Sequence, residues 1–226
     1  MRTLQTIANM CAALFMIAGC DAHIELPDKG LKVGDVMYGN GTVMPFDSAE
    51  AVRNGVIGVV FYVNHDIESN GVQGYAVTLE ETPALALCDT LGVEQETSCD
   101  MEALDGSMNT FKIREKQTSD GIGSPLGSYV TENSDNKGVF IPSAKQMDIL
   151  IKNRETVNLM MERCNGDFVG TDNPDCWYWT STEVKEKATE YAWCYSMANG
   201  QLNETLKNRI YPTRTIIEVR NCDGRK

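Results

Sequence analysis

Six cysteines are the residues of this sequence whose number and spacing most directly suggest chemistry. The chain has eight cysteines, of which two lie in its first twenty residues. The other six are Cys88, Cys99, Cys164, Cys176, Cys194 and Cys222. An even set in an exported chain is typical of disulfide bonds, although six cysteines allow many pairings. Short sequence separation favours Cys88 with Cys99 and Cys164 with Cys176, which leaves Cys194 for Cys222.

The segment between Cys164 and Cys176 carries the residues best suited to bind a ligand. It holds Asp167, Asp172 and Asp175, and Tyr178 follows on the next predicted strand. Carboxylates favour a cationic or neutral polar partner over an anionic one. A bridge across this loop would lower the entropy cost of binding, or it would only stabilise the loop. We therefore predict a ligand-binding surface at these four residues and keep a purely structural loop as the alternative.

The same acids, with Asn173, could supply oxygen ligands to calcium. The sequence has no Trp-Asn-Asp motif to complete such a site, so an acidic solvated loop is the default interpretation. A zinc site is also disfavoured, because there is no Cys-x-x-Cys pair and the two histidines are His23 and His65. We expect neither a metal nor another cofactor.

Sequence motifs of catalysis are missing from the chain. It has no Gly-rich phosphate loop, no Gly-x-Ser-x-Gly turn, and no histidine placed to activate a serine or cysteine. We expect no catalytic residue and predict that the protein is not an enzyme.

Three tryptophans, Trp177, Trp179 and Trp193, could stack on a sugar ring, but two of them are better explained by packing. Burial of so large a ring is strongly stabilising, so we expect Trp179 and Trp193 in the core. Strand alternation directs Trp177 and Trp179 to one face and Tyr178 to the other, which predicts that Tyr178 is exposed.

The N-terminus reads as a processing segment. Arg2 precedes an apolar run that is too short to span a bilayer and ends in Ile17-Ala18-Gly19-Cys20. This ending resembles a bacterial lipobox, which predicts a signal peptide over residues 1–19 and a lipid on Cys20; a plain secretory signal is the alternative. Residues 20–29 then form an acidic tether, and the acyl chains would hold the protein on a membrane.

Net charge limits the partners. The formal net charge is −12, and such a surface repels phosphate backbones, so nucleic acid is excluded. A protein or a neutral glycan remains possible as a ligand.

Apolar patterns predict a chain of strands interrupted by helices. Strands are expected at 31–38, 56–63, 74–79, 177–183, 191–197 and 210–219. A helix should follow Ile141, because Ser143 and Gln146 match a capping box. A second helix is indicated over 157–164. One or two helical turns are possible within 83–92, a turn is expected at 105–110, and 114–137 offers a weak helix at 125–131.

The order of these elements resembles a bacterial family with a C-type-lectin-like fold, related to the carboxyl-terminal domain of the Lcl adhesin. The residues that carry the likeness are Phe140-Ile141-Pro142-Ser143, Tyr178-Trp179-Thr180-Ser181-Thr182-Glu183, Ala192-Trp193, Asn199-Gly200 and Tyr211-Pro212-Thr213-Arg214. The resemblance implies an α+β fold of twisted antiparallel sheets with one or two packed helices and long loops. No linker or composition shift interrupts residues 30–222, so we expect one domain there, before a short tail at 223–226. The resemblance also implies a structural ion pair between Glu183 and Arg214.

No active site accompanies that resemblance. We therefore expect a lipid-anchored binding module: an adhesin, a pilus-associated subunit or an accessory protein of a surface complex. The expected location is the outer membrane of a Gram-negative bacterium, at the cell surface or on the periplasmic face. A relative of formylglycine-generating enzymes and a purely structural envelope protein are the alternatives.

Overall fold

The β-rich run at 56–63 forms the long strand of the largest sheet, as its composition predicts. A computed structural model describes residues 30–66, 71–133, 138–170 and 176–220. Leu31–Lys226 forms one compact unit. The predicted signal peptide, Cys20, the tether and the tail lie outside the described residues.

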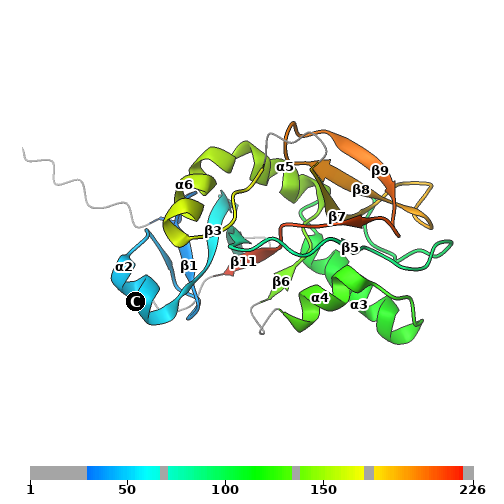
Figure 1. Ribbon diagram of the computed structural model, residues 1–226, viewed down its shortest axis with the longest axis horizontal. Coiled ribbons are helices and arrows are strands. Elements are labelled where there is room, and N and C mark those ends of the chain that lie inside the picture. The colour runs from blue at the N-terminus through cyan, green and yellow to red at the C-terminus, as the bar shows by residue number, and fades with distance from the viewer. Residues whose placement is uncertain (1–29, 67–70, 134–137, 171–175, 221–226) are drawn as a thin grey trace, which may run out of the picture. The chain divides into compact units, whose positions relative to one another are not determined.

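The elements follow one another along the chain as strands separated by helices (Figure 1). The strands are β1 (Val36–Tyr38), β2 (Val43–Met44), β3 (Val56–Val63), β4 (Val72–Thr78), β5 (Leu85–Ala86), β6 (Val139–Phe140), β7 (Trp177–Glu183), β8 (Tyr191–Ser196), β9 (Leu202–Leu206), β10 (Ile210–Tyr211) and β11 (Ile216–Arg220). The helices are α2 (Ser48–Asn54), α3 (Gly106–Ser119), α4 (Pro125–Glu132), α5 (Ala144–Lys152) and α6 (Arg154–Cys164).

These strands form antiparallel sheets. The largest has the order β2-β1-β3-β4-β11-β6, a second pairs β10 with β5, and a third has the order β7-β8-β9. The C-terminal strand β11 lies between β4 and β6, so that Ile216 pairs with both Val77 and Phe140. The predicted α+β class with antiparallel sheets is therefore confirmed, although the predicted single strand at 210–219 is divided into β10 and β11.

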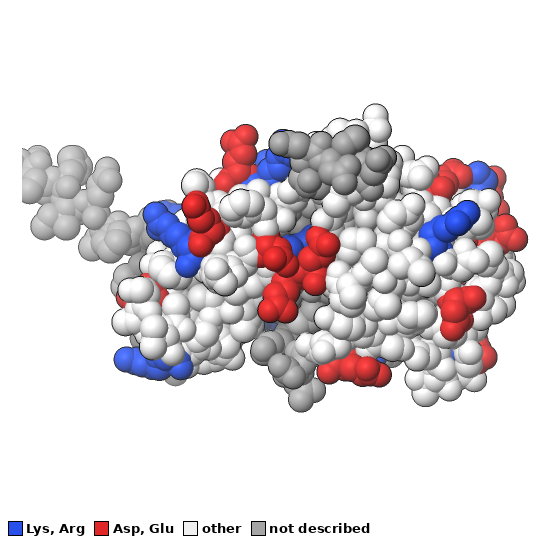
Figure 2. Space-filling view, viewed as in Figure 1, with Lys and Arg blue, Asp and Glu red and all other residues white. Residues whose placement is uncertain are grey.

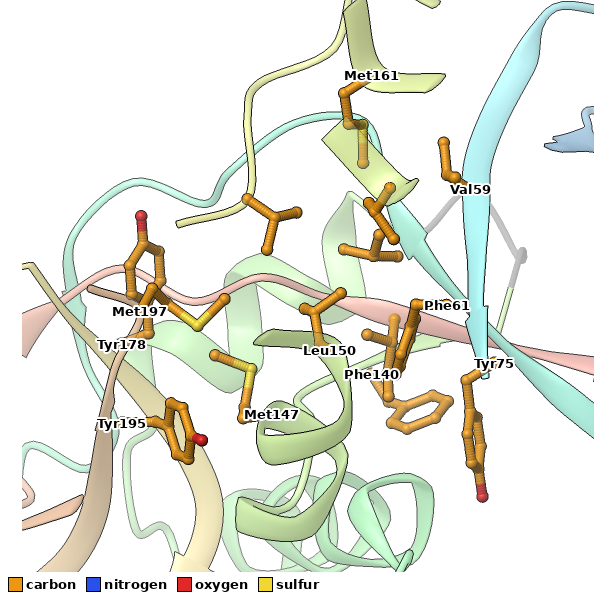
Figure 3. Close-up of a cluster of buried hydrophobic side chains, with 14 of the residues drawn as sticks. Val59, Phe61, Tyr75, Phe140, Met147, Leu150, Met161, Tyr178, Tyr195 and Met197 are labelled. Carbon is orange, nitrogen blue, oxygen red and sulfur yellow. The ribbon is translucent and has the colours of Figure 1, made fainter. Parts of the chain in front are cut away.

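Helix α5 begins where its capping residues predict. The Ser143 side chain accepts a hydrogen bond from the Gln146 backbone, and the Gln146 side chain accepts one from the Ser143 backbone. Its buried face presents Met147 and Leu150 to the main core cluster. Figure 3 shows these two side chains between the rings of Tyr178 and Tyr195 on one side and Phe61 and Phe140 on the other.

Strand β7 is buried on both faces, which corrects one prediction. Trp179 is fully buried as expected, in a cluster with Ile113, Leu126 and Ile141. Tyr178, on the other face, is also buried, with 3% of its surface exposed. The prediction of an exposed Tyr178 was wrong because alternation gives the face of a residue, but a strand between two clusters has no solvent face. Trp193 is half-buried.

Helix α3 corrects a second prediction, because the expected turn at 105–110 opens a helix that runs to Ser119. The buried side of α3 consists of Gly106, Asn109, Thr110 and Ile113. Met108 and Phe111 are exposed instead. A helix that buries polar residues and exposes apolar ones lacks the pattern from which helices are predicted. Residues 83–92 form β5 and loops instead of helical turns.

The predicted disulfide bonds have no support in the structure. The five within the described residues, Cys88, Cys99, Cys164, Cys176 and Cys194, are free thiols, so neither predicted short bridge is present. The Cys88 thiol donates to the carbonyl of Thr90 (3.1 Å). Cys194 lies buried in the Trp179 cluster, and burial raises the pKa of its thiol. Cys222, its predicted partner, lies outside the described residues.

No helix among the described residues is both long enough and apolar enough to cross a membrane.

Candidate functional site

A groove with a cavity volume of about 400 Å³ lies between the large sheet and helix α4. Residues of four strands or their ends line it, together with residues of α4 and the segment after β4. The lining comprises Val56, Ile57, Thr78, Leu79, Glu80, Glu81, Thr82, Tyr129, Val130, Asn133, Val139, Thr215 and Ile217. Its volume lies within the range of roughly 300–1,000 Å³ that is usual for ligand sites.

Helix α4 forms one wall because its N-terminus is fixed to the core. The Ser124 hydroxyl caps the helix by accepting from the Gly127 N–H (3.0 Å), and it donates to the carbonyl of Leu87 (2.7 Å). Leu126 and Val130 pack into the Trp179 cluster. Tyr129 and Asn133, four residues apart, then lie on one side of the helix and border the groove.

The sheet forms the opposite wall. Val139 and Ile217 are register partners on β6 and β11, so their side chains lie next to each other on one face. Ile57, at the start of β3, and Val139 remain half-exposed. The groove therefore offers apolar surface that the fold itself does not cover.

The loop after α6 meets the segment after β4 and forms with it an acidic corner, which we define as Glu80, Glu81 and Asp167. Its backbone is held by Asp167, whose N–H donates to the Leu79 carbonyl (2.8 Å) and whose carboxylate accepts from the Glu81 N–H (3.0 Å). Figure 2 shows acidic side chains gathered near the middle of the displayed face. Because several hydrogen bonds fix this backbone, the carboxylates are presented from a defined position.

Tyr178 lies beneath the acidic corner and bonds to it. Its hydroxyl donates to the Glu81 carboxylate and accepts from the Cys176 thiol (3.3 Å). Burial raises the pKa of the Tyr178 hydroxyl, and the hydrogen bonds with Cys176 and Glu81 raise it further. The Tyr178 hydroxyl is therefore neutral at physiological pH and acts as a hydrogen-bond donor to Glu81.

Arg214 is the buried cation of this corner. Its Nη2 donates to the carbonyls of Thr78 (3.0 Å), Asp167 (3.2 Å) and Leu79 (3.5 Å). Its Nε and Nη1 have no hydrogen-bond partner among the described residues. Burial lowers the pKa of the guanidinium, and the charges of Glu81, Tyr178 and Asp167 oppose that effect. Arg214 thus holds together the end of β4 and the loop that carries Asp167.

The predicted ion pair between Glu183 and Arg214 was wrong, because Glu183 pairs with Lys207. The Glu183 carboxylate lies 2.9 Å from Lys207 Nζ, and both side chains are buried. It also accepts from the backbone N–H groups of Gln95 (2.8 Å) and Thr97 (3.0 Å). Glu96 between them has a positive φ of 58°, which lets both N–H groups point at one carboxylate.

Two predicted ligand-binding residues meet at the acidic corner. Asp167 is exposed, and it is linked to Tyr178 through Glu81. Asp172 and Asp175 lie outside the described residues. Sequence reasoning missed Glu80, Glu81 and the α4 wall. The signal available for them was a pair of adjacent acids that ends a β-rich run and precedes Pro83.

Within the described parts of the chain, no group of three or more His, Cys, Asp or Glu side chains is arranged to hold a metal ion. At the acidic corner, the Asp167 carboxylate accepts from the Glu81 N–H and the Glu81 carboxylate accepts from the Tyr178 hydroxyl.

Comparison with known proteins gives a structural likeness but no family. No protein-family model matches the sequence, and no curated protein is similar to it. The fold is similar to the crystal structure of a fimbrial protein from Bacteroides ovatus ATCC 8483, with a TM-score of 0.64 and 16% sequence identity. The likeness covers 83% of this chain and 49% of that protein, so this chain spans about half of its length. At this identity the likeness shows a shared fold.

Proposed function

We propose that this protein is a lipid-anchored binding subunit of the cell surface, associated with fimbriae and without catalytic activity. The observation that carries the proposal is the structural likeness to a fimbrial protein over 83% of the chain. The lipobox-like Ile17-Ala18-Gly19-Cys20 supports an anchored location, with the acyl chains on Cys20 in the outer membrane.

The proposal extends to the fold family. The α+β class and antiparallel sheets are compatible with a C-type-lectin-like domain related to that of the Lcl adhesin. In such a domain, binding residues lie on loops and edges that a rigid scaffold positions. The groove and the acidic corner fit this description, because sheet, α4 and Arg214 fix their borders.

The proposal can be tested in the organism that makes the protein. Wild type and Cys20→Ala are compared for incorporation of an alkyne fatty acid, for membrane fraction and for presence on sheared fimbriae. The wild type should carry the label, fractionate with the outer membrane and co-purify with fimbriae, whereas Cys20→Ala should remain unlabelled and leave the membrane. Equal labelling of both proteins would exclude the anchor. Absence from fimbriae of a correctly anchored wild type would exclude the fimbrial role.

A further inference from the structure

The groove combines apolar walls with an acidic rim. Its apolar lining comes from the sheet and from α4, namely Val56, Ile57, Leu79, Val139, Ile217, Tyr129 and Val130. Among the described residues of the lining, Glu80 and Glu81 are the charged ones, and none is Lys, Arg or His. A ligand that complements both features carries apolar groups beside positive charge.

The local charge favours a cation strongly. Among the described residues, the carboxylates of Glu80, Glu81 and Asp167 at the acidic corner outnumber the single buried cation, Arg214. The whole chain adds to this field with a formal net charge of −12. A cationic partner is therefore attracted at long range and retained at the rim.

The groove is also ordered before any partner arrives. Arg214 bonds the carbonyls of Thr78 and Leu79 on the lining, and Thr82 exchanges hydrogen bonds with Thr213 (2.8 and 3.2 Å). The Ser124 cap fixes α4 on the other side. A preformed site of this kind loses little conformational entropy on binding.

We propose that this groove binds an extended segment of another protein, in which apolar side chains are flanked by Lys or Arg. The apolar side chains lie between the sheet and α4, and the basic side chains contact Glu80 and Glu81. This inference rests on the proposed function as a surface binding module and names the chemistry of its partner. Several side chains of an extended segment fit the cavity of about 400 Å³, whereas a hydrated inorganic cation would leave the apolar walls uncovered.

The test is fluorescence anisotropy with the full-length lipidated protein in neutral detergent micelles. The probe is a labelled peptide with the core Lys-Leu-Val-Leu-Lys. Two matched peptides replace its charges or its apolar residues: Glu-Leu-Val-Leu-Glu and Lys-Ser-Gly-Ser-Lys. The first peptide should bind at least tenfold more tightly than either of the others. Its affinity should fall when salt is raised from about 0.05 M to about 0.5 M, because exposed charge pairs are screened.

Variants locate the binding on the protein. Glu80→Gln combined with Glu81→Gln should weaken binding of the lysine peptide at least tenfold. The matched control is Glu155→Gln combined with Glu162→Gln, which removes the same charge from two exposed positions of α6 and should change affinity less than twofold. Ile57→Ser should weaken binding at least fivefold by removing half-exposed apolar wall. Its control is Val52→Ser on α2, where 91% of the side chain is already exposed.

Four results would overturn the inference. The first is that the natively folded protein shows no saturable binding at about 1 mM lysine peptide, and the second is that both double glutamine variants lose the same affinity for it. The third is that the glutamate peptide binds as tightly as the lysine peptide, and the fourth is that Ile57→Ser leaves the affinity unchanged. Sedimentation tests one further outcome, which is that the protein self-associates and the Glu80→Gln, Glu81→Gln variant does not. In that case the groove binds a second copy of this chain, and the inference of a different protein as partner is overturned.

Failure here is distinguishable from failure of the proposed function. Co-purification with fimbriae without peptide binding would remove the groove's role and leave the fimbrial role. If the protein binds the peptide but never associates with fimbriae, the groove keeps its role and the fimbrial role is excluded.

Discussion

Lys207 and Arg214 are both fully buried cations, but their surroundings differ. Lys207 donates to the Glu183 carboxylate and to the carbonyls of Val93 (2.9 Å) and Ala188 (2.7 Å), so all three of its N–H donors have partners. Arg214 bonds three carbonyls through Nη2 alone, and its Nε and Nη1 have no partner within the described residues.

The difference contrasts a structural ion pair with the region that we propose for ligand binding. At Lys207, a buried ion pair whose donors all have partners holds neighbouring elements together and leaves no donor free for a ligand. Arg214 bonds the carbonyls of two groove residues, Thr78 and Leu79, and the carboxylates of Glu81 and Asp167 offset its charge. Buried donors without hydrogen-bond partners, close to solvent-accessible surface, are expected where a fold retains a binding site.

Removal of Lys207 should give the largest effect. Lys207→Met leaves the Glu183 carboxylate buried without its cation, so the free energy of unfolding should fall by about 3–5 kcal/mol. Urea unfolding followed by circular dichroism measures this change. Lys187→Met is the control, because that lysine pairs with Glu204 at the surface and its loss should change little. A drop below about 1 kcal/mol in Lys207→Met would show that the pair is dispensable.

Removal of Arg214 should cost less. Arg214→Met loses the three carbonyl contacts but also eliminates a buried charge with two unpaired donors, so the expected loss is about 1–2 kcal/mol. The same urea titration checks it. If Arg214→Met destabilised the protein as much as Lys207→Met, the contrast between the two cations would be wrong.

Substitution of Tyr178, which bonds the acidic corner, should give a smaller and pH-dependent effect. Tyr178→Phe loses the hydrogen bond to Glu81, which should cost about 1 kcal/mol at pH 7. The pKa of Tyr178 is raised above its ordinary value of 10.0, so its contribution is present below pH 10 and is lost as pH rises further. The gap in unfolding free energy between wild type and variant should therefore shrink by roughly 1 kcal/mol between pH 9 and pH 11.

A constant gap over that pH range would mean that the Tyr178 hydroxyl has an ordinary pKa. Tyr38, Tyr75 and Tyr195 also have raised pKa values, and the difference between wild type and variant cancels their contribution.

Thiol reactivity should give the smallest effect, with no change in stability. Half-buried Cys99 and Cys176 should alkylate at least tenfold faster in the native, unreduced protein than buried Cys88 and Cys194. Burial raises the pKa of the Cys88, Cys99 and Cys194 thiols, so the expected difference in rate comes from the access of the reagent to Cys99 and Cys176. Peptide mapping after iodoacetamide treatment measures the rates. Labelling that appears only after reduction would instead support the bridges predicted from sequence spacing.

The sequence was informative where local chemistry decides the structure. The capping pair Ser143 and Gln146 located the start of α5, and a β-rich run located β3 at its observed bounds. The sequence was misleading where tertiary packing decides. The alternation of residues along β7 does not reveal that both faces of the strand are buried, so Tyr178 was wrongly predicted to be exposed.

The candidate site was accessible from sequence only in part. Asp167 and Tyr178 were predicted together, and the structure joins them through Glu81. The α4 wall was predicted only as a weak helix at 125–131, which matches α4 at Pro125–Glu132, but its position beside the sheet was not predicted. A groove between elements distant in sequence depends on their packing, which no local pattern records.

The contrast between the two regions is tested most directly by amide chemical shifts. The unlipidated full-length Cys20→Ala protein is titrated with the Lys-Leu-Val-Leu-Lys peptide and followed by two-dimensional NMR. Shifts should concentrate at residues 78–82, 129–133 and 139 around the groove, while Gln95 and Thr97 at the saturated ion pair should not move. Shifts confined to 93–97 and 183–207, or spread evenly over the acidic surface, would contradict a recognition site beside Arg214.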